Sequence, residues 1–352
     1  MDQIEKIRLT QFAHGAGCGC KISPQVLETI LAGNKPDVFG NLLVGNKGND
    51  DAAVLKLNES EALISTTDFF TPIVDDAFVF GQTAAANALS DVYAMGGKPI
   101  LALAILGWPI DKLPASLANQ VLEGARSICE EAGIPLAGGH SIDSPEPIFG
   151  LSVNGLVKIN HLKKNNTAKA GDLIFITKAL GTGILATAAK RDLLPLQALA
   201  PLYAQLSKLN SIGTKLGESD FVTALTDVTG FGIMGHLIEM AEGSGLTAEI
   251  QYDKLPILEH VKPLLSQNII PDATYRNWNA YGEKTTIDAA VNPVESFQIL
   301  PDPQTNGGLL IAVDPAGLEL MQELLAQNGY EAFCEPIGKF VAAMGKGLRV
   351  ES

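Results

Sequence analysis

The sequence predicts a two-domain protein, with an α+β first domain and an α/β-like second domain. Three observations support this fold class. A chain of 352 residues exceeds what one hydrophobic core usually organises. Both halves mix strand-like and helix-like segments. Between them the sequence turns polar over 158–171 (KINHLKKNNTAKAG), which predicts a boundary between a domain over 23–160 and a domain over 168–352.

Composition and charge narrow the classes of function that the chain can serve. Apolar residues make up 46% of the chain and aromatic residues only 6%, so its cores must consist mainly of Ala, Leu, Ile and Val. The formal net charge is −14 and no stretch is rich in Lys or Arg, so we expect neither nucleic acid nor a membrane as partner. A protein of this charge binds ATP more readily through a bridging metal ion than through basic side chains alone. Taken alone, the charge is more simply explained by solubility.

The sequence gives no sign of export, membrane insertion or disulfide bonding. Its first residues, MDQIEKIRLTQ, lack the basic and apolar regions of a secretory signal. The longest apolar run, 100–110, is far shorter than the ~20 residues that span a bilayer. The four cysteines are Cys18, Cys20, Cys129 and Cys334. Because a bridge between the first two would be strained, we expect no disulfide framework and a cytoplasmic protein.

The first half is predicted to begin with a loop and to continue as the α+β domain. Residues 1–22 are expected to be flexible, because glycines at 15, 17 and 19 interrupt any apolar periodicity. A helix is expected over 80–95, and its alanine-rich interior requires a closely packed neighbour. On this helix Asn87, Ser90 and Asp91 share one face. The other expected elements are helices over 25–31 and 116–132, strands over 52–57, 62–65, 100–106, 134–137 and 149–157, and a loop over 138–147.

The second half is predicted to start again with a strand followed by a glycine turn and a helix. An amphipathic helix is expected over 230–242, because Ile233, Leu237 and Met240 recur on one side of it. The other expected elements are strands over 172–177, 223–225, 309–313, 332–341 and 348–350, the turn GTG at 181–183 with its helix, and a helix over 316–327.

Several aspartates stand at the ends of predicted elements or beside small residues. They are Asp50, Asp51, Asp68, Asp91 and Asp227. Carboxylates spread over several elements suit Mg²⁺, which prefers oxygen ligands and shares them with nucleotide phosphates. Most isolated aspartates only cap helices or begin turns, and this explanation suffices for any one of the others alone. Asp91 differs, because a carboxylate within an alanine-packed helix is costly unless it is paired or bound to a metal.

The sequence Cys18-Gly19-Cys20-Lys21 brings two thiols and an amine together in the glycine-rich segment. A neighbouring ammonium increases the thiolate fraction of a cysteine, so Cys18 is a candidate nucleophile or partner of a chalcogenide. Lys21 is also a candidate phosphate ligand. The two cysteines could instead form half of a soft-metal site, which we rank second, or pack passively, which we rank third. The chain has neither a Walker A motif nor a kinase glycine-rich loop, so ATP would need metal ions and loop amides.

A set of short segments then connects these residues to a known family. In chain order they are HGAGCGCK at 14–21, NDDAAV at 49–54, STTDFF at 65–70, NALSDVYAMGGKP at 87–99, AGGHSID at 137–143, TDVTGFG at 226–232 and DPQTNGGLL at 302–310. Together they resemble the selenophosphate synthetase family. Some are shared with the wider aminoimidazole-ribonucleotide (AIR)-synthetase-like ATP-binding superfamily, whereas HGAGCGCK resembles the selenide-handling loop of this family alone. Asn306 departs from the resemblance, because serine is expected at that position.

The resemblance implies a homodimer of AIR-synthetase-like chains whose N-terminal sheets pair, with a sandwich-like C-terminal domain and ATP between the two halves. It also implies the reaction of ATP, selenide and water to selenophosphate, AMP and phosphate. By motif, Cys18 and Lys21 would be catalytic, and Mg²⁺ would be held by Asp51, Asp91 and Asp227. The implied ATP contacts are Lys21, Gly48, Asn49, Asp50, Asp68, Asp91, Gly139, His140 and Ser141, the last three offered across the dimer.

Two other functions are compatible with parts of this pattern. A sibling ATP enzyme, such as a small-molecule kinase or an amidine-forming synthetase, would share the aspartates and glycines but has no evident use for the C-x-C-K segment. A non-catalytic soft-metal carrier would use Cys18 and Cys20 but would not need the scattered aspartates.

Overall fold

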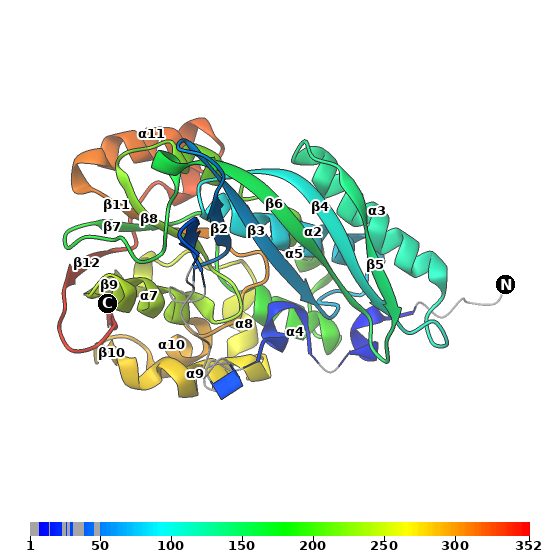
Figure 1. Ribbon diagram of the computed structural model, residues 1–352. Coiled ribbons are helices and arrows are strands. Elements are labelled where there is room, and N and C mark those ends of the chain that lie inside the picture. Colours follow the sequence, from blue (N-terminus) through cyan, green and yellow to red (C-terminus); the bar gives the residue numbers. More distant parts are fainter. Residues whose placement is uncertain (1–6, 14, 23–25, 27–28, 31–38, 46–49) are drawn as a thin grey trace.

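The computed structural model describes residues 7–13, 15–22, 26, 29–30, 39–45 and 50–352 (Figure 1). Gly48, Asn49 and most of the helix predicted over 25–31 lie outside the described residues. The N-terminal glycine-rich segment contains two short 3₁₀ helices, η1 (Leu9–Phe12) and η2 (Gly17–Cys20). It is therefore not an open loop throughout, although its sequence has no periodicity that predicts a helix.

The first domain is built on a six-stranded mixed sheet. The strands are β1 (Leu42–Val44), β2 (Ala53–Lys56), β3 (Glu61–Phe70), β4 (Lys98–Trp108), β5 (Leu136–Asp143) and β6 (Ile148–Lys158). Their order in the sheet is β1-β2-β3-β6-β4-β5, and only β4 and β5 run parallel. Two helices, α2 (Ala77–Ala94) and α3 (Ala115–Glu131), cover one face of this sheet (Figure 1).

The alanine-rich helix α2 is buried along almost its whole length, as its composition predicts. It packs closely on α3 through two glycines. A Cβ atom on Gly81 would lie 1.9 Å from the carbonyl oxygen of Val121, and one on Gly124 would lie 1.9 Å from that of Phe78. Only glycine permits this approach of the two helices. The other side of α2 faces the second domain, where it contacts α5 (Leu196–Ser207) and β8 (Val222–Asp227).

The second domain has a seven-stranded mixed sheet with helices on both faces. Its remaining strands are β7 (Leu173–Ile176), β9 (Leu246–Gln251), β10 (Thr285–Ile287), β11 (Leu309–Val313), β12 (Gly338–Ala342) and β13 (Leu348–Glu351). The strand order is β10-β13-β9-β12-β7-β11-β8, with β10-β13 and β13-β9 parallel. The other helices are α4 (Thr182–Lys190), α6 (Ile212–Gly217), α7 (Gly232–Gly243), α8 (Val261–Leu265), α9 (Asp272–Tyr281), α10 (Pro293–Ile299) and α11 (Leu318–Gln327).

Side chains alternate along the strand β11 and are buried on both faces of the second sheet. Leu309, Ile311 and Val313 point into a core with α6 and α11, whereas Leu310 and Ala312 point into the main core with α7. A strand that is buried on both faces appears in the sequence as the continuous apolar run LLIAV. The prediction of two domains that each mix strands and helices is confirmed.

One predicted loop is wrong. Residues 138–143 of the GGHSID sequence belong to strand β5, which pairs in parallel with β4 from Ala104↔Gly139 to Trp108↔Asp143. The strand lies at the edge of the sheet and almost all of it is exposed, so it shows no apolar alternation. Gly139 has φ of +152°, and a Cβ atom there would lie 2.0 Å from the carbonyl oxygen of Ala104. Gly139 therefore reflects close strand pairing rather than a loop.

Large apolar side chains remain exposed on the strands of the first sheet. They are Phe69, Ile100, Leu103 and Ile142. Neighbouring residues such as Phe70 and Ala102 are buried toward α2 and α3, so strand alternation places Phe69 and Leu103 on the opposite face. Ile142 shares that face, because its partner on β4 is Gly107, four residues from Leu103. Ile100 is exposed at a shift in the register between β4 and β6. Among the described residues, no helix combines the length and the apolar character that crossing a membrane requires.

Candidate functional site

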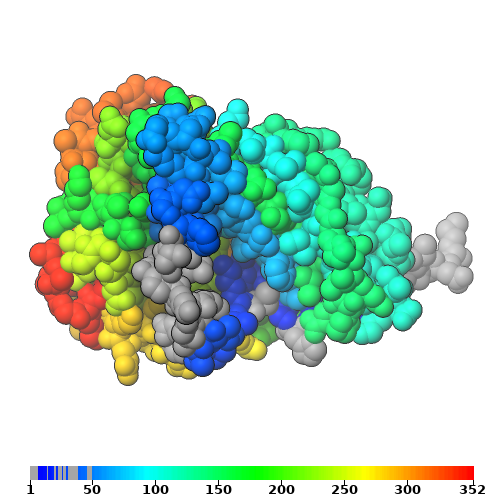
Figure 2. Space-filling model, viewed as in Figure 1, coloured from blue at the N-terminus to red at the C-terminus, as the bar shows by residue number. Residues whose placement is uncertain are grey.

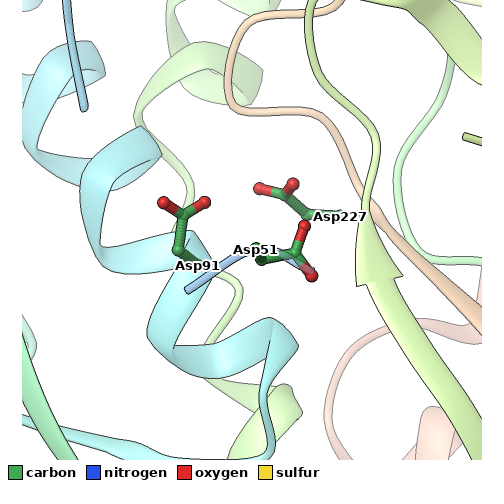
Figure 3. A group of neighbouring side chains, drawn as sticks. All are labelled: Asp51, Asp91 and Asp227. Carbon is green, nitrogen blue, oxygen red and sulfur yellow. The ribbon is translucent and has the colours of Figure 1, made fainter. Parts of the chain in front are cut away.

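Three of the predicted aspartates converge between the two domains (Figure 3). Asp51 lies two residues before the start of β2, Asp91 lies in α2, and Asp227 ends β8. Each offers one carboxylate oxygen, and these oxygens all lie within 4.8 Å of one another. We call this group the aspartate trio. Asp91 and Asp227 are buried, with 7% and 1% of their surface exposed.

A hydroxyl group holds each carboxylate of the trio. The Thr226 hydroxyl donates to Asp51 Oδ1 (2.8 Å), and the Thr66 hydroxyl donates to Asp91 Oδ2 (2.5 Å). These two threonines lie on the strands β8 and β3. Hydrogen bonds of this kind fix the carboxylate planes and leave other oxygens available. Among the described residues, the buried Asp51 Oδ2 has no hydrogen-bond partner.

The third carboxylate is held through a short chain of hydrogen bonds. The Ser90 hydroxyl donates to Asp227 Oδ2 (2.5 Å). Asn210 Nδ2 in turn donates to the Ser90 oxygen (2.7 Å) and to the carbonyl of Gly307 (2.9 Å). These hydrogen bonds are buried, and they join α2 of the first domain to the 302–308 loop of the second domain at the site.

Burial and mutual repulsion disfavour the ionised form of the trio. Burial, followed by the charge of Asp227, raises the pKa of Asp51 well above its usual range. Burial and then the charge of Asp68 do the same to the pKa of Asp91. Burial also raises the pKa of Asp227 to about 6, although its bond from Ser90 and the charge of Lys21 oppose that shift. Three such carboxylates fit a divalent cation, because it would compensate the repulsion that otherwise retains protons.

Cys18 is brought to the same place by the segment of residues 15–21, which we call the cysteine segment. Cys18 is only 1% exposed. Its backbone N–H donates to the Thr305 hydroxyl (3.0 Å), and its Sγ donates to Asn87 Oδ1 (3.2 Å). Gly17 has φ of +51°, and a Cβ atom there would lie 2.4 Å from Thr305 Oγ1, so the turn requires glycine.

Asn87 links the thiol to a further predicted carboxylate. Its Oδ1 accepts from the Cys18 thiol (3.2 Å) and from the backbone N–H of Asn306 (2.8 Å). Its Nδ2 donates to Asp68 Oδ2 (2.6 Å). Because both donors reach the same oxygen, the orientation of the buried amide is defined, and the cysteine segment is connected to the aspartates through one side chain.

Lys21 extends toward the same carboxylates from the exposed end of the cysteine segment. Its Nζ lies 3.5 Å from the Thr229 hydroxyl and 5.9 Å from the centre of the Phe231 ring. Although the residue as a whole is exposed, its ammonium is surrounded by protein atoms. This burial lowers the pKa of Lys21, but nearby negative charge, with Asp68 contributing most, outweighs burial and raises it overall. The amine is therefore charged at neutral pH.

A neutral histidine positions the threonine that Lys21 contacts. His236 Nε2 accepts from the backbone N–H of Thr229 (3.0 Å), and His236 is buried on α7. Burial, reinforced by the charge of Lys21, lowers the pKa of His236 to about 3. The ring therefore adds no positive charge beside Lys21.

The remaining predicted residues divide into two groups. Asp50 precedes Asp51 in the sequence but is not part of the trio. Its Oδ1 accepts from the backbone N–H of Asn165 (2.9 Å). Gly139, His140 and Ser141 lie on β5, at the opposite edge of the sheet from β2, and they are exposed. Within one chain the structure does not bring these three residues to the aspartate trio.

Sequence reasoning missed several hydroxyl and amide residues of the site. They are Thr66, Thr226, Thr229, Asn210 and Thr305. Strand periodicity could have identified the first, because Thr66 lies two residues before Asp68 on β3 and so shares its face. Asn210 and Thr305 carry no comparable signal, since they lie in connections outside the helices and strands.

Comparison with known proteins agrees with this arrangement. Residues 49–157 match the family described as AIR synthase related protein, N-terminal domain, and residues 169–351 match its C-terminal domain. The chain is 54% identical over 348 residues to a selenide, water dikinase of Colwellia psychrerythraea, covering 97% of each chain. The chain belongs to the selenide, water dikinase family. The two matched domains together carry the aspartate trio, with Asp51 and Asp91 in the first and Asp227 in the second.

Solved structures share the fold at much lower identity. A thiamine-monophosphate kinase from Stenotrophomonas maltophilia superposes with a TM-score of 0.64 at 21% identity, covering 88% of this chain and 91% of that one. A hydrogenase maturation protein HypE in complex with ATP gives a TM-score of 0.65 at 18% identity, covering 86% and 85%. These similarities support the AIR-synthase-like fold of both domains.

Proposed function

We propose that the chain uses ATP to convert selenide and water into selenophosphate, AMP and phosphate. The observation that carries the proposal is the single hydrogen-bonded connection from the Cys18 thiol through Asn87 to Asp68, beside the aspartate trio. This connection supports a role for Cys18 as a soft nucleophile beside carboxylates that suit nucleotide phosphates. Membership of the selenide, water dikinase family supports the same reaction, and the ATP-bound HypE of the same fold supports ATP as the substrate.

The trio is proposed to hold Mg²⁺ through Asp51, Asp91 and Asp227. Asp51 Oδ2, which has no hydrogen-bond partner within the described part of the chain, and the clustered oxygens fit this role. When bound, Mg²⁺ would neutralise phosphate charge and help to hold the transferred phosphoryl group in line. The hydroxyls of Thr66, Thr226 and Ser90 keep the carboxylates oriented without using all of their oxygens.

The side chains of the cysteine segment have complementary roles in the proposal. The Lys21 ammonium, which stays charged, attracts the phosphate oxygens and stabilises negative charge on the transferred group. The Cys18 thiol receives or guards the selenium atom, and Asn87 Oδ1 holds its proton until then. Burial of Cys18 excludes water from the thiol.

ATP is proposed to lie between the domain over 23–160 and the domain over 168–352, with residues 1–22 as a flexible cover. Asp50 and Asp68 would contact it from beside the trio, together with Lys21 and Asp91. Gly48 and Asn49 precede Asp50 directly in the sequence and would join them.

We further propose a cytoplasmic homodimer in which the first sheets pair. Phe69, Leu103 and Ile142 form an exposed apolar face that suits such pairing. It would also give Gly139, His140 and Ser141 a route to the nucleotide of the partner subunit. Ile142→Glu should therefore produce monomers in analytical ultracentrifugation, and an unchanged dimer would contradict this arrangement.

The decisive test of the reaction is ³¹P NMR of the purified protein with ATP and Mg²⁺ under anaerobic conditions, with and without selenide. We expect a new selenide-dependent phosphorus resonance and the accumulation of AMP. ADP as the sole product, independent of selenide, would instead indicate a sibling kinase or synthetase. Stoichiometric binding of Cu(I) or Zn²⁺ without ATP turnover would indicate a metal carrier.

A further inference from the structure

The outer side of the cysteine segment forms the floor of a basic cavity. The cavity measures about 420 Å³, and its lining includes Gly15, Gly19, Lys190, Arg191 and Arg276. The two glycines belong to the cysteine segment, whereas Lys190 ends α4, Arg191 follows it and Arg276 lies on α9. In the space-filling view the dark blue N-terminal residues lie between the cyan and green surface of the first domain and the yellow surface of the second (Figure 2).

The three cations of this basic pocket donate to backbone carbonyls rather than to carboxylates, although Asp75 and Glu146 lie close enough to interact electrostatically with Lys190. Lys190 Nζ donates to the carbonyls of Ala13 (3.0 Å) and Gly15 (3.4 Å). Arg276 donates to the carbonyl of Gly19 (2.6 Å), and Arg191 lies 3.5 Å from that of Ile270. Within the part of the chain that the structure describes, none of the three cations makes an ion pair.

The local charge of the basic pocket contrasts with that of the whole chain. Asp272 is the one carboxylate among the lining residues, against three cations. The chain as a whole has a formal net charge of −14. A concave surface with this local excess of positive charge raises the concentration of small anions next to it. Cys18, which is 1% exposed, lies in the same segment that forms the floor.

We propose that the basic pocket binds a small inorganic anion, and that this anion is hydrogenselenide before it reaches Cys18. The proposal rests on the proposed function, since selenide is the substrate there. Hydrogenselenide carries one negative charge at neutral pH and so matches the pocket in charge, and the cavity of about 420 Å³ admits it together with its hydration water. The phosphate and selenophosphate products share this chemistry, so the experiment must distinguish substrate from product.

The same contacts couple anion binding to the release of the thiol. Lys190 and Arg276 hold the cysteine segment on both sides of Cys18 by donating to backbone carbonyls. A bound anion competes for these donors, because a charged acceptor forms a stronger hydrogen bond than a neutral carbonyl. Its arrival therefore weakens two bonds that keep the segment closed.

Arg191 offers the cleanest test, because it lines the pocket without bonding to the cysteine segment. Cys18 of the full-length protein is alkylated with anionic iodoacetate and with neutral iodoacetamide, and the Cys18 peptide is quantified by mass spectrometry. Arg191→Gln should lower the iodoacetate-to-iodoacetamide rate ratio roughly two- to fivefold, as expected for the loss of one partly screened charge. Arg191→Lys should restore it. The matched control is Arg126→Gln, an exposed arginine on α3, which should leave the ratio unchanged.

Steady-state kinetics then assign the anion. We expect Arg191→Gln to raise the KM for selenide by a similar factor at unchanged kcat. An unchanged KM with weaker inhibition by inorganic phosphate would assign the pocket to product and overturn the substrate assignment. If the wild-type protein makes selenophosphate but neither the alkylation ratio nor KM responds to Arg191→Gln, the basic pocket has no such role. A changed ratio in a protein that makes no selenophosphate would refute the proposed function and leave an anion site.

Discussion

The aspartate trio and the cysteine segment meet at one site but are built in different ways. Each aspartate belongs to or adjoins a regular element, and a hydroxyl from a strand or from α2 orients it. The cysteine segment has a single 3₁₀ turn and is held by isolated hydrogen bonds, among them those from Cys18 to Thr305 and Asn87. The aspartate trio is therefore fixed by the packing of regular elements, whereas the cysteine segment is held by a few hydrogen bonds.

This difference matches the two tasks that the proposed reaction sets. Phosphate chemistry needs charges held at constant positions, which packed strands and helices provide. A thiol that receives a small substrate must become accessible and then exclude water, which requires a segment with few bonds to break. We therefore predict that substitutions in the trio and substitutions in the cysteine segment change different measured quantities.

The largest expected effect comes from the trio. Asp227→Asn should lower selenophosphate formation on the order of a thousandfold, because a divalent cation loses a charged ligand. In the absence of Mg²⁺ the variant should nevertheless melt at a higher temperature than the wild type, since burial and the charge of Asp68 no longer disfavour an ionised group there. Turnover assays and thermal melts with and without Mg²⁺ measure both effects. The control is Asp220→Asn, an exposed carboxylate before β8; wild-type turnover in Asp227→Asn would remove the trio from the mechanism.

Changes in the cysteine segment should reduce turnover, and loss of the Cys18 thiol should do so without reducing nucleotide binding. Cys18→Ser and Lys21→Ala should each lower selenide-dependent turnover by about a hundredfold. Binding of Mg²⁺-ATP should stay within about threefold for Cys18→Ser, because the trio is intact. Calorimetric titration with a non-hydrolysable ATP analogue measures that binding, and Cys334→Ser provides a control at a cysteine far from the site in the sequence. Full activity of Cys18→Ser would contradict the role of the thiol.

The pH dependence of stability should contain a contribution from Asp227, and the difference between the wild type and Asp227→Asn isolates it from the other buried groups whose pKa values are shifted. The pKa of Asp227 in the folded protein is raised to about 6 from 3.8, so the folded state holds its proton more tightly than the unfolded state. Its contribution to the free energy of unfolding is therefore fully present below 3.8 and is lost as pH rises through about 6. Without Mg²⁺, chemical denaturation between pH 4 and 7 should show this loss in the wild type. Asp227→Asn should show a smaller loss; identical slopes would mean that Asp227 does not titrate in this range.

The affinity for Mg²⁺ should rise with pH, because the same Asp227 carboxylate then loses its proton. Because a proton on Asp227 competes with the cation, Mg²⁺ should bind up to about tenfold more weakly for each pH unit below about 6. Isothermal titration with Mg²⁺ at several pH values measures this dependence. Lys21→Ala should displace the curve toward higher pH, since the Lys21 charge lowers the pKa of Asp227.

The two regions also differ in how far the sequence predicted them. Composition located α2 and short apolar segments located β8 and β11 closely, and the cost of a carboxylate in an alanine-rich helix singled out Asp91. Those arguments rest on local patterns that the fold preserves. Periodicity could not predict β5, because an exposed edge strand with glycines shows no alternation.

The contacts of the cysteine segment were beyond any local pattern. Cys18 is bonded to Thr305, which is 287 positions away in the sequence, and to Asn87, which is 69 away. The first pair forms only when the second domain packs against the cysteine segment, and the second pair only when that segment packs on α2. The sequence identified the reactive residue types, whereas the buried state of Cys18 and the bridging role of Asn87 depend on tertiary structure.

The smallest expected effect concerns Asn306, which bonds to Asn87, the side chain that connects the cysteine segment to Asp68. Its backbone N–H donates to Asn87 Oδ1, and its side chain donates to the carbonyls of Leu206 (2.7 Å) and Lys208 (2.9 Å) at the end of α5. Its φ is +48°, a conformation that asparagine tolerates better than serine does. Asn306→Ser should therefore lower the free energy of unfolding by about 1–3 kcal/mol, as measured by urea denaturation.

Turnover of Asn306→Ser should change less than about twofold, because the backbone bond to Asn87 does not need the asparagine side chain. Asn306→Gly separates the two causes of destabilisation, since it accepts the positive φ but loses the side-chain bonds. Equal destabilisation by both substitutions would assign the effect to the bonds with α5, and a smaller loss in Asn306→Gly would assign part of it to backbone strain. A large loss of turnover at unchanged stability would contradict the separation of the two regions, because a side chain that bonds only to α5 would then control the thiol through Asn87.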